Sequence, residues 1–246
     1  QYTLEGHDDI DLLVSHRDYA VRLTNAQPVF PQSYRVYHHI TIKGKKVAFD
    51  FRHVGDDYYD KIWEKKILET RTMQKNLFYV PAPTERFYTL LYHAYVQKPR
   101  VKDDYYPKLA RYANEIKVNY NKDILSSMIL LTSYLKLNKY AITKAKDKSV
   151  HYNKKHVLLI EGYEFFNNIG YEDLSPVHLD SNSWSGYVYF VGKYNGRKVF
   201  IKYGGIDDSC LNEYRFTKRM WDMDNNHYVE PITNGNNKNT NYIVFE

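Results

Sequence analysis

The chain has 246 residues and a mass of 29.4 kDa, enough for one large domain or two small ones. Apolar residues make up 43% and charged residues 26%, with 11 Gly and 8 Pro, which excludes collagen-like and disordered classes. The 35 basic and 29 acidic side chains give a net charge of +6, which weakly favours anionic partners such as phosphates. The 26 tyrosines are unusual, and the sequence alone offers no functional explanation for them.

The cysteine content and hydropathy bear on where the protein works. A single cysteine, Cys210, excludes an intramolecular disulfide and a zinc cluster, so we predict a reducing, cytoplasmic location. No apolar run approaches the ~18 residues of a membrane span, and the first residues lack the layout of a signal peptide, so we expect no transmembrane segment. Because the chain starts at Gln1 rather than Met, we expect a cut or processed end.

The first part of the chain is predicted to combine strands with helices. The turn Lys43-Gly44-Lys45 joins two β-rich runs and indicates a hairpin. The expected strands are 8–14, 34–42 and 46–53, with a short helix at 17–25. After these, apolar residues recur at three and four spacing, which predicts helices at 58–72, 84–98, 104–117 and 122–137.

The second part returns to strands after a basic, aperiodic stretch. Residues 139–155 are the candidate linker, which gives domains at 1–138 and 156–246. Asn195-Gly196 is a second strong hairpin turn. We predict strands at 157–161, 186–194, 198–203, 228–232 and 242–246, and a helix at 209–220. The expected fold class is therefore α+β, with a mixed sheet and helical region followed by a small antiparallel sheet.

Three acids form the first candidate site. Residues two apart on a strand share a face, so Asp9 and Asp11 would present two carboxylates side by side. Asp50 lies in the second arm of the predicted hairpin, with its side chain on the face opposite Val47 and Phe49. Hard oxygen ligands of this kind suit Mg²⁺, and carboxylates on neighbouring strands could hold metal ions that activate a hydroxyl for attack on a phosphate.

Other interpretations of these residues stay open. The acids near the start could form a solvated acidic turn instead of a metal site. Asp56 and Asp57 are a weaker alternative pair of ligands, because Gly55 before them indicates a turn. Arg52 and His53 could meet a phosphate, although Arg52 could equally pair with a carboxylate.

The stretch D-D-I-D-L-L-V, followed by V-A-F-D-F, resembles the nucleotidyltransferase fold of the DNA polymerase beta superfamily. The resemblance covers roughly Gln1 to Leu137, with the helices after Tyr58 as the helical region that often follows that core. It implies Asp9, Asp11 and Asp50 as Mg²⁺ ligands, Asp50 as a general base and a nucleoside triphosphate as substrate. The Gly-Ser motif that the family carries before the acid pair is not in this chain.

The stretch S-G-Y-V-Y-F-V-G-K-Y-N-G-R-K-V-F-I-K, followed by L-N-E-Y-R-F, resembles the N-terminal lobe of the protein-kinase-like fold. The resemblance implies Gly186 in a loop over ATP phosphates, and Lys202 paired with both the phosphates and Glu213. Only Gly186 of the glycine-rich pattern is plain, and Lys202 could also be a surface lysine at the end of a strand. The H-R-D and D-F-G segments are absent from the sequence, which favours a fragment of a longer protein.

The remaining candidates favour structural roles. His38 and His39 are adjacent, so on a strand they face opposite sides and cannot form a paired metal site. His93 is expected to pack in the core or beside the active site, and Cys210 is expected to be a small buried residue. Residues 139–155 interleave lysines with tyrosines, a pattern that fits nucleic acid or a membrane surface less well than a solvated linker.

Together these patterns predict a Mg²⁺-dependent nucleotidyltransferase-fold enzyme fused to a kinase-like module. The acceptor would be a small hydroxyl or phosphate compound, for which analogy suggests a sugar or polyol phosphate used in glycan synthesis. A protein or tRNA acceptor is also open, although nucleic acid is not favoured. The alternatives are a kinase-like phosphotransferase fragment and a non-catalytic nucleotide-binding or regulatory protein.

Overall fold

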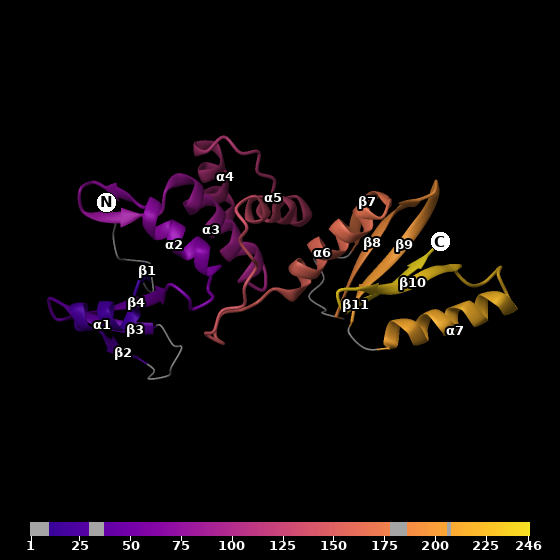
Figure 1. Ribbon diagram of the computed structural model, residues 1–246, viewed down its shortest axis with the longest axis horizontal. Helices are drawn as coiled ribbons and strands as arrows, with labels where there is room; N and C mark the ends of the chain where they lie inside the picture. The colour runs from indigo at the N-terminus through magenta and orange to yellow at the C-terminus, as the bar shows by residue number, and fades with distance from the viewer. Residues whose placement is uncertain (1–9, 30–36, 178–185, 206–207) are drawn as a thin grey trace. The chain divides into compact units, whose positions relative to one another are not determined.

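In the computed structural model, the described residues are 10–29, 37–177, 186–205 and 208–246. They form seven helices and three sheets, so the predicted α+β class is confirmed (Figure 1). The chain divides into two compact units, and the division falls within one helix. The first unit holds Gln1–Lys122 and Leu130–Tyr152, and the second holds Asp123–Ile129 and Asn153–Glu246.

The first unit contains a mixed four-stranded sheet in the order β1-β4-β3-β2. β1 runs parallel to β4, and the other neighbours are antiparallel. The predicted hairpin forms, because Lys43 and Gly44 take the positive φ angles of 48° and 78° that a two-residue turn requires. The strands are β1 (Ile10–Val14), β2 (Gln27–Pro28), β3 (Tyr37–Ile42) and β4 (Lys45–His53).

Five helices accompany this sheet along the chain, and four of them follow the predicted helical pattern after β4. The first of these four begins at Asp60, whose side chain accepts a hydrogen bond from the Ile62 amide at 2.7 Å. The helices are α1 (Arg17–Thr24), α2 (Lys61–Thr70), α3 (Pro83–Val96), α4 (Tyr105–Glu115) and α5 (Ile124–Leu137). A hairpin that the sequence did not predict, β5 (Thr72–Gln74) and β6 (Phe78–Val80), follows α2.

Aromatic side chains form the core of the helical region. Trp63 is fully buried, and the rings of Tyr59, Tyr92 and Tyr140 lie 5.0, 5.7 and 5.6 Å from it. Its indole Nε1 donates a hydrogen bond to the Glu85 carboxylate at 2.5 Å. Many of the 26 tyrosines therefore have a structural role, since their rings fill the core while their hydroxyls reach polar partners.

The segment predicted as a linker packs mainly on the first unit. Tyr140 stacks on Trp63 with an interplanar angle of 11°. The Thr143 amide donates to the Tyr92 hydroxyl at 2.9 Å, and that hydroxyl donates to the Thr143 carbonyl at 3.0 Å. Only the end of the segment, from Lys154, belongs to the next helix.

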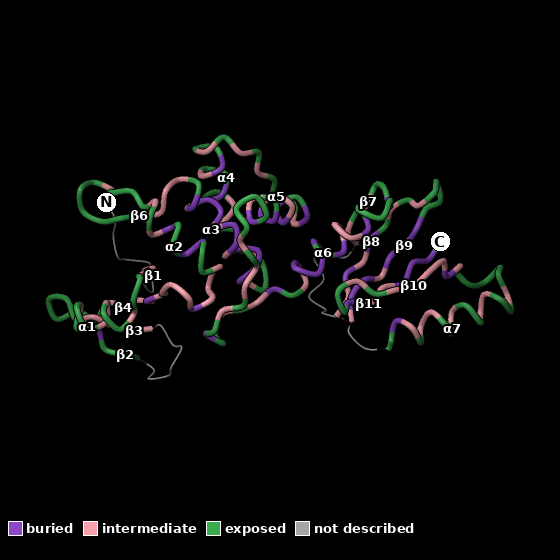
Figure 2. Tube along the Cα trace, in the orientation of Figure 1, coloured by how far each residue is buried: buried purple, intermediate pink, exposed green. Residues whose placement is uncertain are grey.

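The second unit has a five-stranded antiparallel sheet in the order β10-β11-β9-β8-β7. Its strands are β7 (Glu172–Val177), β8 (Tyr187–Tyr194), β9 (Arg197–Gly204), β10 (Pro231–Asn237) and β11 (Thr240–Phe245). One helix, α6 (Lys154–Asn168), packs against β7, β8 and β9, and the other, α7 (Ser209–Met223), packs against β10 and β11. Figure 2 shows buried stretches in α6 and in the central strands.

The predicted strand at 157–161 is wrong, because these residues lie inside α6. The run V-L-L-I is buried, and a short buried apolar run does not by itself distinguish a strand from a helix. Asn153 begins the helix by accepting a hydrogen bond from the His156 amide at 3.1 Å. The sequence also missed β7 and placed β10 a few residues too early.

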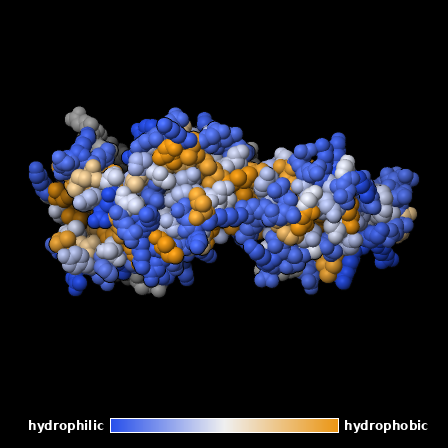
Figure 3. Space-filling model, turned by 45° about the horizontal axis from the view of Figure 1, so that its top comes forward, coloured by the Kyte–Doolittle hydropathy of each residue, from blue (hydrophilic) through white to orange (hydrophobic). Residues whose placement is uncertain are grey.

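Among the described residues, no helix is long and apolar enough to cross a lipid bilayer. The face shown in Figure 3 is mostly hydrophilic, with apolar residues in separate patches. Several large apolar side chains are nevertheless exposed, including Leu77 at 77% in the turn between β5 and β6.

Gly162 provides a test of packing in the second unit. A Cβ at this position would lie 2.8 Å from Tyr203 Cδ1 and 3.0 Å from Phe190 Cε2. We expect Gly162→Ala to lower the free energy of unfolding by about 1–3 kcal/mol through overpacking, despite the better helix propensity of alanine. Urea unfolding measures this loss. The exposed Asn167→Ala on the same helix should change stability little, and equal effects of both changes would contradict the packing assignment.

Candidate functional site

Two of the predicted acids face each other across a parallel strand pair. Asp11 on β1 is in register with Asp50 on β4. Residues in register on neighbouring strands point to the same face, and such strands lie about 4.8 Å apart. The structure therefore brings the Asp11 and Asp50 carboxylates together, while Asp9 lies outside the described residues.

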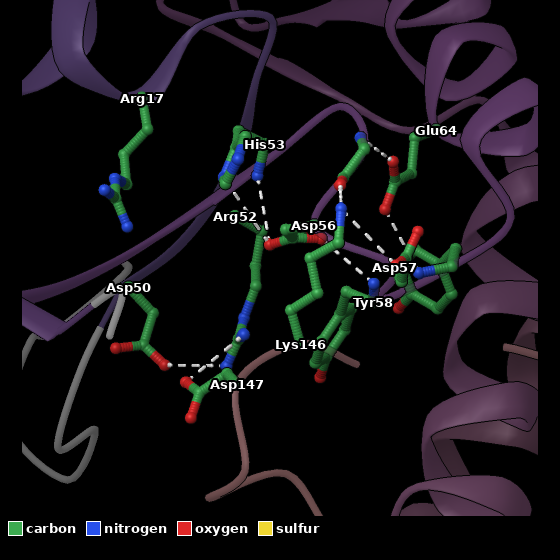
Figure 4. A network of polar contacts seen from close by, with 12 residues as sticks. Arg17, Asp50, Arg52, His53, Asp56, Asp57, Tyr58, Glu64, Lys146 and Asp147 are labelled. Atoms are coloured by element: carbon green, nitrogen blue, oxygen red, sulfur yellow. Dashed lines mark hydrogen bonds and ion pairs between the residues drawn. The ribbon is translucent and has the colours of Figure 1, made fainter. Parts of the chain in front are cut away.

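Arg52 stands on the same face as Asp50, two residues further along β4. Its Nη2 lies 3.8 Å from Asp50 Oδ2, and its Nη1 lies 3.5 Å from Asp147 Oδ2 (Figure 4). The guanidinium also lies over the Tyr58 ring, 4.3 Å from its centre. Arg52 is only 11% exposed, so two carboxylates and an aromatic face hold one buried cation.

A cavity of about 420 Å³ opens beside this strand pair within the first unit. Asp11 and Arg52 form part of its wall, together with Leu12 and Leu13 of β1 and the loop residues Tyr58 and Tyr59. Side chains from α2, α3, α4 and the β5–β6 hairpin line the remainder. Three more cations line it: Arg71, Arg86 and Lys108. One carboxylate and four cations thus line the cavity, and three of the cations also pair with carboxylates outside the lining: Arg52 with Asp50 and Asp147, Arg86 with Glu115, and Lys108 with Asp104.

The cations of the wall are held by neighbouring groups. The Arg86 Nη2 donates to both oxygens of Glu115 at 2.7 and 2.6 Å. Arg71 lies over the Tyr79 ring at 4.7 Å, and Lys108 pairs with Asp104 at 3.1 Å. These contacts orient the side chains before any ligand arrives.

His93 also lines this cavity, in agreement with its predicted place beside the site or in the core. Its Nδ1 lies 2.8 Å from the Tyr58 hydroxyl and 3.1 Å from Gln97 Oε1. Burial, together with the nearby Lys98 charge, lowers the pKa of His93 to about 4. The imidazole is therefore neutral at pH 7 and acts as a hydrogen-bonding wall residue.

The loop after β4 is closed by two buried carboxylates. Asp56 accepts hydrogen bonds from the amides of Tyr58 at 3.0 Å and His53 at 3.3 Å. Glu64 accepts from the amides of Gly55 at 2.6 Å and Tyr59 at 3.1 Å. Both carboxylate oxygens of Asp56 thus bind backbone amides of the loop that places Tyr58 in the cavity wall.

A lysine from a distant part of the chain fastens the outside of this loop. Lys146 Nζ donates to the Gly55 carbonyl at 2.5 Å and lies 3.4 Å from Asp57 Oδ2 (Figure 4). Asp57 has a positive φ of 61°, as expected for a turn. The alternative pair of metal ligands, Asp56 and Asp57, therefore has a structural explanation.

Burial raises the pKa of Glu64 to about 7. The two backbone amides oppose this increase, and the neighbouring Asp56 carboxylate adds to it. Glu64 is fully buried, so its charged form beside the buried Asp56 carboxylate is disfavoured.

In the second unit, Lys202 and Glu213 form the predicted pair. Lys202 Nζ donates to Glu213 Oε2 at 2.5 Å, and the same nitrogen lies 4.2 Å from the centre of the Tyr187 ring. Gly186 has a φ of 81°, and a Cβ there would meet no atom of the described residues within 4 Å. The residues just before Gly186, which complete the predicted loop, lie outside the described residues.

The other candidates have structural places. His38 is buried and makes an edge contact with Phe51 at 5.2 Å. Cys210 is buried, with its thiol 3.8 Å from the Gly204 carbonyl, as predicted for a small core residue. His39 lies on β3 next to His38.

Sequence reasoning missed most of the cavity wall. Arg71, Arg86 and Lys108 come from three separate parts of the helical region, and each alone has the pattern of a surface residue. Asp147 lies in a basic segment that gave no signal, although it is only 5% exposed and pairs with Arg52. The run G-D-D-Y-Y had marked the loop, but nothing pointed to Glu64.

Comparisons with known proteins add no further information about the site. No protein-family model matches the chain, and no curated protein has a matching sequence. Within the part of the chain that the structure describes, no group of three or more His, Cys, Asp or Glu side chains is arranged to hold a metal ion.

Glu64 predicts a pH dependence of stability. Its pKa in the folded protein is above the ordinary value of 4.5, so the folded state binds the proton more tightly than the unfolded state. This contribution to stability is fully present below pH 4.5, and it is lost as the pH rises towards 7. We expect it to decrease by roughly 3 kcal/mol over that interval.

The measurement is urea unfolding across that pH range for the wild type and for Glu64→Gln, which cannot titrate. The amide changes the free energy of unfolding by an amount that does not depend on pH. The test is therefore how the stability difference between the two proteins varies with pH. Glu69→Gln, an exposed change on the same helix, should give a flat difference. A flat difference for Glu64→Gln as well would contradict the raised pKa.

Proposed function

We propose that the first unit is a Mg²⁺-dependent nucleotidyltransferase that binds a nucleoside triphosphate in the cavity beside Asp11. The observation that carries this proposal is the register of Asp11 with Asp50 on parallel strands. Two adjacent carboxylates repel each other, and a divalent cation with a preference for oxygen ligands removes the repulsion. The resemblance of the sequence to the nucleotidyltransferase fold adds Asp9 as a third ligand.

The side chains present fit such a metal ion. Asp11 and Asp50 offer hard oxygen atoms on one face, and Asp11 opens to the cavity. When bound, Mg²⁺ would supply positive charge to the phosphates of the nucleotide. No third ligand among the described residues joins this pair, so the proposal depends on the two residues in register.

The chain's own groups divide the remaining tasks. Arg71, Arg86 and Lys108 bind and orient phosphate oxygens, since their charges face the same cavity. Asp50 accepts the proton of the attacking hydroxyl or phosphate at its carboxylate. The acceptor oxygen forms a bond to the α-phosphorus, the bond to the β-phosphate bridge breaks, and pyrophosphate leaves. Tyr58 and Arg52 form the wall that keeps Asp50 in position.

Two observations support the proposed class of acceptor. A cavity with four cations favours an acceptor that carries a phosphate, such as a sugar or polyol phosphate. The ion pair between Lys202 and Glu213 supports a second, kinase-like nucleotide site in the second unit. A protein with both sites would add a phosphate to a small molecule and then activate it with a nucleotide.

The first test is calorimetric binding of each nucleoside triphosphate with Mg²⁺. We expect the combined Asp11→Asn and Asp50→Asn changes to weaken binding at the first unit by at least about tenfold, because the metal ligands are lost. Lys202→Ala should leave that binding unchanged. Asp173→Asn with Asp222→Asn, both on exposed carboxylates, is the matched control.

The outcomes separate the candidate functions. Loss of binding only with Lys202→Ala would assign nucleotide binding to the second unit and contradict the proposed nucleotidyltransferase site. Absence of binding in the wild type would favour a non-catalytic protein. A change of net charge alone is ruled out as the cause if the control double variant binds as the wild type does.

A further inference from the structure

A second cavity of the first unit lies against α1, the end of β4 and α2. Its volume is about 650 Å³, larger than that of the cavity beside Asp11. Arg17 and Arg22 of α1 and Lys61 and Lys65 of α2 line it. Lys61 and Lys65 are four positions apart, so they project from the same side of α2.

Most of the charged side chains on this cavity wall are positive. Among the described lining residues, four cations share the cavity with one carboxylate, Asp18, whose side chain is 87% exposed and lies 3.6 Å from Arg17. Among the described residues, no carboxylate lies within ion-pair distance of Arg22, Lys61 or Lys65. Lys61 and Lys65 repel each other at their spacing of four positions on the helix.

The cavity is separate from the site beside Asp11. Consecutive residues of a strand point to opposite faces, and at the end of β4 Arg52 lines the first cavity whereas His53 lines the second. In the part of the chain that the structure describes, the two cavities share no lining residue. A ligand in the second cavity therefore does not need the carboxylate pair.

His53 adds a polar group without adding charge. Burial lowers its pKa; Asp56 opposes this, and Arg17 and Lys146 lower it further. The imidazole is therefore neutral at pH 7. The contributions of Arg17 and Lys146 to its lowered pKa agree with a positively charged environment. A ligand here meets the neutral His53 imidazole and several cations.

We propose that this second cavity binds a small molecule carrying a phosphate group with at least two negative charges. Such a group matches the excess of cations, and arginine and lysine donors pair well with phosphate oxygens. The volume leaves room for a part of the molecule beyond the phosphate.

The probe is inorganic pyrophosphate, titrated by calorimetry into the full chain in the presence of a metal chelator. Lys61→Gln with Lys65→Gln should weaken binding at least about tenfold, because two charge-assisted contacts are lost. The matched control is Lys144→Gln with Lys148→Gln, which removes the same charge from exposed lysines outside the cavity. Thermal unfolding confirms that all variants remain folded.

The result that supports the proposal is a loss in the first double variant and unchanged affinity in the control. Equal losses in both would show that only net charge attracts the anion, and unchanged affinity in both would place pyrophosphate elsewhere; each overturns the proposal. Vesicles of phosphatidic acid in phosphatidylcholine are tested in parallel. Binding to vesicles without binding to pyrophosphate would also overturn it, in favour of a lipid surface.

Discussion

A tyrosine buried in a protein core needs a hydrogen-bond partner for its hydroxyl, and this requirement organises the first unit. Glu85 is buried and accepts hydrogen bonds from both Trp63 and Tyr134. Because these donors come from α2 and α5 and the acceptor from α3, one carboxylate links three helices. The walls of the cavity beside Asp11 depend on the position of α2 and α3, so the aromatic core fixes the geometry of the site.

The same requirement brings a distant segment to the strands. Tyr92 exchanges two hydrogen bonds with Thr143, which holds the stretch before α6 against the helices. A few residues later, Asp147 reaches Arg52. The hydrogen bonds between Tyr92 and Thr143 thus help to position Asp147 beside Arg52.

Local chemistry made part of this structure predictable. The turns at Lys43-Gly44 and Asn195-Gly196 were recognisable because positive φ angles favour glycine and asparagine. The two-residue spacing of Asp9 and Asp11 and the alternation of side chains around Asp50 indicated strands. The register between these strands could not be predicted, because it depends on how they pair in the folded protein. The buried run of α6 was misassigned because an apolar residue at every position carries no periodicity. Asp147 and Glu64 were missed since their roles arise only when separate segments meet.

The parallel pairing of β1 with β4 also has a kinetic consequence. Asp11 and Asp50 are 39 positions apart in the sequence, whereas β3 and β4 are joined by a two-residue turn. Local pairings close faster than distant ones, because less chain entropy is lost before contacts form. During folding the β3–β4 hairpin should therefore form first, and β1 should dock onto a preformed edge. The two carboxylates come together in that late step, so the chain bears their mutual repulsion only after most of the stabilising contacts of the sheet exist.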